Sequence, residues 1–241
     1  MKEYIQQLPP DKLVPFQNHP YQVREDAALS ELMESIRTHG VLSPLLARPK
    51  GESYELVSGH RRRLAAQKLG LKTVPVLVRE MSDDEAVILM VDSNLQRENL
   101  LPSEKAFAYK MKLDAMKRQG RRTDLTSVQI GQKLGQTSRA MIASQSPDSN
   151  TQIQRYIRLT HLVRPILDMV DQNSFALNAA VEISYLPEEH QNTLLEAMDY
   201  AQVSPSLAQA RRIRAFSDSG KLDANVLDAI LSEEKPLERK V

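Results

Sequence analysis

The sequence of 241 residues contains no cysteine, and no hydrophobic run approaches the roughly 20 residues of a membrane-spanning helix. The lack of cysteine excludes disulfides and cysteine-ligated zinc, and it fits a reducing compartment. The first ten residues also lack the apolar segment of a secretory signal. We therefore expect a cytoplasmic protein that is not exported and has no membrane partner.

A net charge of only +1 conceals an uneven distribution of charge along the chain. Residues 1–60 carry six Lys and Arg against eight Asp and Glu, a balance of −2. Residues 110–164 carry eleven Lys and Arg against three Asp, a balance of +8. Clustered positive charge of this kind indicates a polyanionic partner, which we expect to bind the middle of the chain.

The spacing of apolar residues predicts a small α+β domain over residues 1–100. Alternation of apolar residues predicts strands, and apolar stripes three and four residues apart predict helices. The predicted elements are a helix over residues 28–39, strands over 45–48, 54–58 and 73–79, with the first two forming a hairpin, and a helix over 84–97. Pro75 indicates that the third strand is an edge strand or that it starts there.

One stretch combines a sharp turn with basic side chains: residues 56–66 read Leu-Val-Ser-Gly-His-Arg-Arg-Arg-Leu-Ala-Ala. Gly59 permits a tight turn and a close approach of a ligand, and the helix that follows offers free backbone N–H groups. Arg61 and Arg62 add guanidinium groups that suit phosphate oxygens. The stretch predicts a phosphate-binding turn, and the alternative is a solvated basic helix face.

A second polar cluster lies at the end of the helix predicted for residues 84–97. Asn94 and Arg97 are three residues apart, so they share one helical face. The alternative is a helix end that frays into solvent before Pro102.

The rest of the chain is predicted to be helical, with a helix-turn-helix over residues 138–162. Residues 101–122 predict a connecting helix and a basic linker, residues 123–217 an all-α domain, and residues 218–241 a C-terminal helix and charged tail. A short helix, a turn and a second helix in succession favour DNA binding, although the same pattern occurs in helical proteins that bind no DNA. An alternative register takes residues 127–134 as the first helix.

The expected DNA contacts are polar side chains on and near the second helix of this motif, directed away from its apolar stripe. Amide and guanidinium groups contact base edges, and guanidinium groups also contact phosphates. The expected DNA-binding residues are Arg121, Arg139, Ser149, Asn150, Gln152, Gln154, Arg155 and Arg158.

Three stretches, taken together and in this order, resemble the ParB family of bacterial partition proteins. Residues 18–24 (Asn-His-Pro-Tyr-Gln-Val-Arg) are similar to its first nucleotide-binding box, residues 59–62 to its Gly-Glu-Arg-Arg box, and residues 94–100 to its Glu-Asn-Leu-Gln-Arg box. The resemblance covers about residues 14–185. It implies an N-terminal domain that binds CTP, a helix-turn-helix that recognises a centromere-like site in double-stranded DNA, a clamp-like homodimer controlled by CTP, and a ParA-type ATPase as a partner.

Carried over by position, the resemblance also implies individual site residues, with CTP and Mg²⁺ as cofactors. The implied nucleotide-binding residues are Gln22, Arg24, Gly59, His60, Arg61, Arg62, Asn94, Gln96 and Arg97, and Asn94 is also the implied Mg²⁺ ligand. Ser93 stands where the family has a glutamate tied to Mg²⁺ and hydrolysis, so CTPase activity is expected to be slow or absent. His60 replaces a glutamate, and Val23 replaces a proline.

The last 21 residues are too few for the family's C-terminal dimerisation domain, which suggests a divergent member of plasmid or mobile-element type, associated with the nucleoid or a plasmid. A hypothesis of another class is an enzyme, either a ParB-like nuclease or another nucleotide-dependent enzyme, because the same N-terminal fold resembles sulfiredoxin. Sulfiredoxin chemistry is excluded without cysteine, and a nuclease needs clustered carboxylates, for which only Asp92 and Glu98 stand near the boxes. A transcriptional regulator that uses the same helix-turn-helix is a further alternative.

Overall fold

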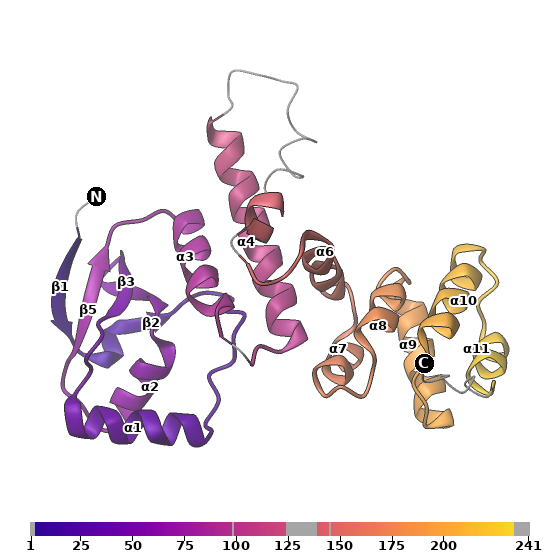
Figure 1. Cartoon of the computed structure of the whole chain (residues 1–241), viewed down its shortest axis with the longest axis horizontal. Helices are drawn as coiled ribbons and strands as arrows, with labels where there is room; N and C mark the ends of the chain where they lie inside the picture. Colours follow the sequence, from indigo (N-terminus) through magenta and orange to yellow (C-terminus); the bar gives the residue numbers. More distant parts are fainter. Residues whose placement is uncertain (1–2, 98, 124–138, 145, 234–241) are drawn as a thin grey trace. The chain divides into compact units, whose positions relative to one another are not determined.

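The computed structural model describes residues 3–97, 99–144 without 124–138, and 146–233 (Figure 1). The chain divides into two compact units, residues 1–98 with 111–142 and residues 99–110 with 143–241. The first unit contains a mixed sheet and the second is helical. The predicted α+β class is therefore confirmed. The short helix of the alternative register, residues 127–134, lies outside the described residues.

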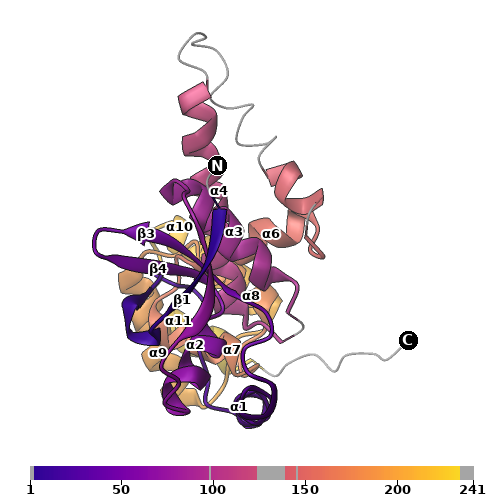
Figure 2. The same ribbon diagram turned by 90° about the vertical axis from the view of Figure 1, so that its left-hand side faces the viewer.

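A five-stranded mixed sheet of order β1-β5-β3-β4-β2 forms the centre of the N-terminal unit. Its strands are β1 (Glu3–Leu8), β2 (Leu13–Pro15), β3 (Leu45–Lys50), β4 (Ser53–Ser58) and β5 (Val74–Arg79). The predicted hairpin is confirmed, because β3 and β4 pair antiparallel and lie side by side in Figure 2. β5 lies between β1 and β3, so the prediction that Pro75 marks an edge strand is wrong. Pro75 is the second residue of its strand, as the alternative of a strand start required.

Three helices accompany the sheet in this unit: α1 (Ala27–His39), α2 (His60–Lys68) and α3 (Asp83–Leu95). The two adjacent alanines of α2 pack in different apolar clusters. Ala66 belongs to the core cluster of the sheet, whereas Ala65 packs in the cluster that contains Leu29 and Ile36 of α1. Helix α2 therefore lies between the sheet and α1 (Figure 1), and its first turn has a fixed position beside the end of β4.

Residues 102–123 form one continuous helix, α4 (Pro102–Thr123), and the border between the two compact units falls within it. The first part belongs to the C-terminal unit, where the backbone N–H and the hydroxyl of Ser103 donate to Asp171 at 2.9 and 2.5 Å. The later part belongs to the N-terminal unit, where Lys112 forms a salt bridge with Asp92.

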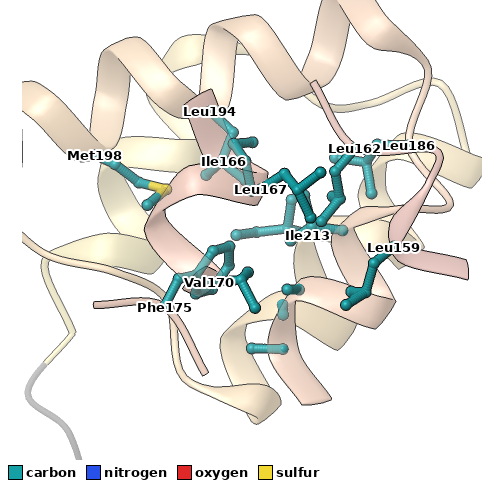
Figure 3. Packing of buried hydrophobic residues seen from close by; sticks show 14 of the residues in the cluster. Leu159, Leu162, Ile166, Leu167, Val170, Phe175, Leu186, Leu194, Met198 and Ile213 are labelled. Carbon is teal, nitrogen blue, oxygen red and sulfur yellow. The ribbon is translucent and has the colours of Figure 1, made fainter. Parts of the chain in front are cut away.

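The C-terminal unit consists of helices, most of which contribute to a large apolar core (Figure 3). After α4 and a helical segment at residues 139–144, the chain forms α6 (Asn150–Leu159), α7 (Arg164–Asp171), α8 (Leu177–Ile183), α9 (Glu188–Ala201), α10 (Leu207–Asp218) and α11 (Ala224–Leu231). The apolar stripes that predicted a helical region supply the core, for example Ile166, Leu167 and Val170 of α7. Nowhere in the described residues does a helix have the length and apolar character that crossing a membrane requires.

Candidate functional site

A cavity of about 290 Å³ lies in the N-terminal unit, where three segments far apart in the sequence meet. Its lining residues are His19, Tyr21, Gln22, Val23, Leu32, Ser58, Gly59, His60, Arg61, Arg62, Asn94 and Arg97. All three boxes of the sequence analysis thus contribute to one pocket. Of the nine side chains expected to bind nucleotide, Arg24 and Gln96 are the two outside this lining, and both are exposed.

Gly59 forms the turn that lets the backbone enter this pocket. It precedes α2 as its N-cap residue, with φ of 101°, a conformation that residues with a Cβ rarely adopt. A Cβ at this position would lie 2.9 Å from Cγ of Leu45, which is fully buried in the sheet. The structure therefore requires glycine here for both backbone conformation and space.

Arg61 and Arg62, the two arginines of α2 that line the pocket, have different hydrogen-bond partners. Arg61 donates from Nη2 to Oδ1 of Asp26 at 2.5 Å. Arg62 donates from Nη1 to the carbonyl oxygens of Ser43 and Pro44 at 2.5 and 3.0 Å, and it forms no salt bridge within the described part of the chain. Partial burial of the guanidinium lowers the pKa of Arg62, and no described acidic residue forms a salt bridge with it. An anion in the pocket would supply a negatively charged partner.

Two histidine rings pack together at the same place, with centroids 3.8 Å apart for His19 and His60. Burial is the main reason that the pKa of His60 is lowered to about 3, and the nearby His19 and Arg63 contribute to the same shift, so the ring is neutral at physiological pH. Nε2 of His60 is buried and makes no hydrogen bond with any described residue. His19 and Tyr21 were missed as site residues, although their position three and one residues before Gln22 was a usable signal.

The end of α3 supplies the third side of the pocket. Asn94 donates from Nδ2 to the carbonyl oxygen of Met90 at 2.8 Å, and Arg97 approaches Oδ1 of Asn94 at 3.5 Å. The first contact fixes the Asn94 amide against its own helix, and the second places the guanidinium of Arg97 near the amide oxygen. The alternative of a fraying end does not describe Asn94, which lies inside α3, whereas Arg97 lies after the helix end and is exposed.

The donor set does not fit a magnesium ion held by the protein. Magnesium is usually bound by one or two carboxylates together with substrate phosphates. The lining of the pocket holds no carboxylate, and no group of three or more His, Cys, Asp or Glu placed to hold a metal occurs among the described residues. Asn94, the expected Mg²⁺ ligand, therefore has no acidic companion in the lining.

In the C-terminal unit, α6 is the second helix of the motif expected to bind DNA. Ser149 caps it by accepting from the backbone N–H of Gln152 at 3.3 Å, which gives the Ser149 side chain a structural role. Ile153 is fully buried, while Gln154 and Arg155 are exposed on the other side of the helix. The expected division of α6 into an apolar and a polar side is thus present.

Arg158 differs from the other expected DNA contacts, because its guanidinium bonds within the unit. Nε donates to the hydroxyl of Ser184 at 3.0 Å and Nη2 to the Ser184 carbonyl oxygen at 2.5 Å. The guanidinium also lies over the ring of Tyr185, 4.0 Å from its centroid. Arg139 lies in the helical segment described over residues 139–144, and the side chain of Arg121 is outside the described residues.

The turn before α6 is held by side chains of α4, an arrangement that sequence reasoning missed. Asp148 accepts from Nζ of Lys105 at 3.0 Å and from the hydroxyl of Tyr109 at 2.7 Å. Tyr109 is fully buried, and burial raises the pKa of its hydroxyl, which therefore remains a donor. The start of α6 is thus fixed by contacts to a helix about 40 residues earlier.

The two units define a class: an α+β domain with an arginine-lined pocket, followed by a helical domain with a polar exposed helix. The ParB N-terminal domain family matches residues 1–95. The probable chromosome 1-partitioning protein ParB of Deinococcus radiodurans is 33% identical over 218 residues, which are 90% of this chain and 69% of the relative. The chain belongs to the ParB family of partition proteins.

Solved structures of ParB proteins are similar as well. The Pnob8-like ParB-N domain, in its C2221 form, aligns with a TM-score of 0.52 at 16% identity and covers 96% of this chain and 98% of its own. This likeness supports the fold. The C-terminally truncated ParB from Caulobacter crescentus complexed with CTP-gamma-S aligns with a TM-score of 0.37 at 25% identity and covers 95% of this chain and 99% of its own. The family match and the relative from Deinococcus radiodurans confirm, at the level of the family, the resemblance drawn from three short stretches.

Proposed function

We propose that this ParB-family chain is a CTP-regulated, site-specific DNA-binding protein that acts in DNA partition, in a plasmid or mobile-element system. One observation carries the nucleotide part of the proposal. Residues from three boxes, separated by more than 30 residues each, line a single cavity with three arginines. Such convergence favours a ligand-binding pocket over three separate solvated surfaces.

The chemistry of the pocket suits a nucleoside triphosphate. The start of α2 presents backbone N–H groups and the positive end of the helix dipole beside Gly59. Arg62 and Arg97 bring guanidinium charge that no acidic residue offsets within the described chain, and such groups bind phosphate with charge-assisted hydrogen bonds. The ring of His19 and the neutral ring of His60 pack together and add flat surface on the same side.

Arginine substitutions in α2 test the nucleotide proposal. Arg62→Ala should weaken CTP binding at least about tenfold, because a hydrogen bond to a charged group contributes about 1.5–3 kcal/mol. Arg63→Ala is the matched control, since Arg63 donates to the Pro10 carbonyl oxygen and lies outside the lining. Isothermal calorimetry with CTP, ATP, GTP and UTP measures both affinity and preference. No CTP binding by the wild type, with or without cognate DNA, would contradict the proposal.

The DNA part of the proposal depends on the exposed side of α6. Residues of its first turns, Asn150, Gln152, Gln154 and Arg155, carry groups that read base edges. The surrounding stretch has a balance of +8, which favours a polyanion. We place Arg155 at the bases, and Arg121 and Arg139 at phosphates.

Substitution of Arg155 separates sequence recognition from general affinity. Arg155→Ala should lower the preference for cognate over random DNA by about 1–3 kcal/mol, the value of one bidentate base contact. The control is Arg164→Ala, an exposed arginine of α7 that pairs with Asp168. Binding to both DNAs is measured at several salt concentrations. An unchanged specificity ratio in Arg155→Ala would show that α6 does not read the bases, and the register with residues 127–134 would be tested next.

Three further features belong to the same proposal: a homodimer, a ParA-type ATPase as partner, and CTPase activity that is slow or absent because Ser93 provides no carboxylate. Light scattering with and without CTP tests the dimer, and phosphate release tests hydrolysis. A ParA-type gene beside the coding sequence would support partition, and conjugation genes beside it would support a mobile element. Rapid CTP turnover by the wild type would contradict the role given to Ser93.

A further inference from the structure

We propose that this pocket binds a nucleoside triphosphate without a divalent cation, with guanidinium groups supplying the positive charge that magnesium supplies in most triphosphate sites. The inference rests on the proposed nucleotide function of the same pocket. It begins from the composition of the lining, which in the described chain includes three arginines and neither aspartate nor glutamate. A magnesium ion at a triphosphate normally depends on at least one protein carboxylate.

Two described carboxylates near the lining, those of Asp26 and Asp92, are already engaged. Oδ1 of Asp26 accepts from the backbone N–H of Leu29 at 2.9 Å and from Arg61 at 2.5 Å. Asp92, on α3, forms a salt bridge with Lys112, whose side chain is almost completely buried. Moving either carboxylate to a metal would remove a helix cap or break the ion pair of a buried ammonium group, both of which are unfavourable.

The neutral oxygens beside the pocket are poor substitutes. The hydroxyl of Ser93 donates to the carbonyl oxygen of Met90 at 2.9 Å and accepts from Nδ2 of Asn94 at 3.3 Å. Oδ1 of Asn94 faces the guanidinium of Arg97 at 3.5 Å. A divalent cation at that oxygen would be repelled by the guanidinium, whereas a phosphate oxygen beside Arg97 would be attracted.

Positive charge for the triphosphate is present without a metal. Arg62 and Arg97 form no salt bridge within the described residues, and the planar forks of arginine match phosphate oxygens. His60 occupies the first turn of α2 as a neutral ring, so the side chain at this position carries no charge of either sign. The protein groups and the helix start therefore replace the electrostatic role of the cation.

The test compares CTP affinity of the full chain in magnesium and in EDTA, by calorimetry at constant ionic strength. We expect the two dissociation constants to agree within about threefold, a difference well below the tenfold step of 1.4 kcal/mol. Ser93→Glu adds a carboxylate beside Asn94 and should make CTP binding at least about tenfold tighter in magnesium than in EDTA. Ser93→Gln has the same length without the charge and should behave as the wild type does.

The outcomes distinguish a failure of metal independence from a failure of the proposed nucleotide function. CTP binding by the wild type that is lost in EDTA would overturn metal independence and leave the nucleotide function in place. No CTP binding in either buffer would overturn both. If Ser93→Glu does not fold, as circular dichroism would show, the wild-type comparison decides alone. Titration of Mn²⁺, followed by its electron paramagnetic resonance signal, gives a second measure. The wild type with CTP should hold no more Mn²⁺ than CTP does by itself, and additional bound Mn²⁺ would overturn the inference.

Discussion

Replacing Gly59 by alanine should damage the fold and the pocket together, for reasons that the geometry makes quantitative. With φ of 101°, Gly59 adopts a conformation that costs an L-residue about 1–2 kcal/mol. The new Cβ would lie 2.9 Å from Cγ of Leu45 and 3.2 Å from Nη2 of Arg62. Leu45 is fully buried, and overpacking of a core side chain costs about 1–3 kcal/mol. We therefore expect the free energy of unfolding of the N-terminal unit to fall by about 2–5 kcal/mol.

Gly51→Ala is the matched control for this substitution. Gly51 lies in the turn between β3 and β4 with φ of 61°, and no heavy atom lies within 4 Å of the position of its Cβ. It should lose only the backbone contribution, about 1–2 kcal/mol. The difference between the two variants, about 1–3 kcal/mol, isolates the contact with Leu45 and Arg62.

Urea denaturation followed by circular dichroism gives the stability of both variants, and calorimetry gives their affinity for CTP. Because the added methyl group displaces the guanidinium of Arg62, we expect Gly59→Ala to bind CTP at least about tenfold more weakly than Gly51→Ala. Equal losses of stability would show that the close packing around Gly59 is relieved without cost. Unchanged CTP affinity in a folded Gly59→Ala variant would refute the role given to the turn.

Two further predictions concern buried groups. Tyr109→Phe should lower the stability of the C-terminal unit by about 1.5–3 kcal/mol and weaken DNA binding, because the hydroxyl loses its bonds to Asp148 and Ser146; thermal melting and DNA titration measure both effects. Folding lowers the pKa of His60 from 6.5 to about 3, so between these pH values the unfolded chain binds a proton that the folded chain does not. The free energy of unfolding should therefore be highest above pH 6.5 and decrease as the pH falls toward 3. His60→Phe should reduce that slope by up to about 1.4 kcal/mol per pH unit in urea denaturation at pH 5 and 7, and an unchanged slope would place the linked proton elsewhere.

The parts of the fold that sequence reasoning could predict are those whose own residues show the pattern. The helix α1 and the strands β3, β4 and β5 have apolar spacing that burial requires, and each appears within one to two residues of the expected bounds. The strands β1 and β2 do not have such apolar spacing and were not predicted. Five of the six residues of β1 are exposed, and β2 has only three residues, so both are defined by the partner strands β5 and β4 rather than by their own side chains.

In the candidate site, too, local features could be predicted and contacts between distant residues could not. Gly59 and Arg62 could be predicted because a glycine turn followed by arginines suits phosphate, whereas a binding role for Asn94 was implied only by the family resemblance; all three line the pocket. The ring contact between His19 and His60 was not predicted, since it joins residues 41 positions apart and neither box alone indicates it. The anchoring of Asp148 by α4 is equally non-local, and only tertiary structure identifies it.

The contact between Arg61 and Asp26 connects the pocket with the chain around it. Oδ1 of Asp26 accepts from Arg61 and also caps α1 through the backbone N–H of Leu29. A phosphate group that takes the guanidinium of Arg61 would leave the cap in place but remove the ionic contact between the start of α1 and the first turn of α2. An anion bound in the proposed site would therefore compete with Asp26 for one side chain. Binding there would then affect the contact that holds the start of α1, next to the residues of the segment 18–26 that line the pocket.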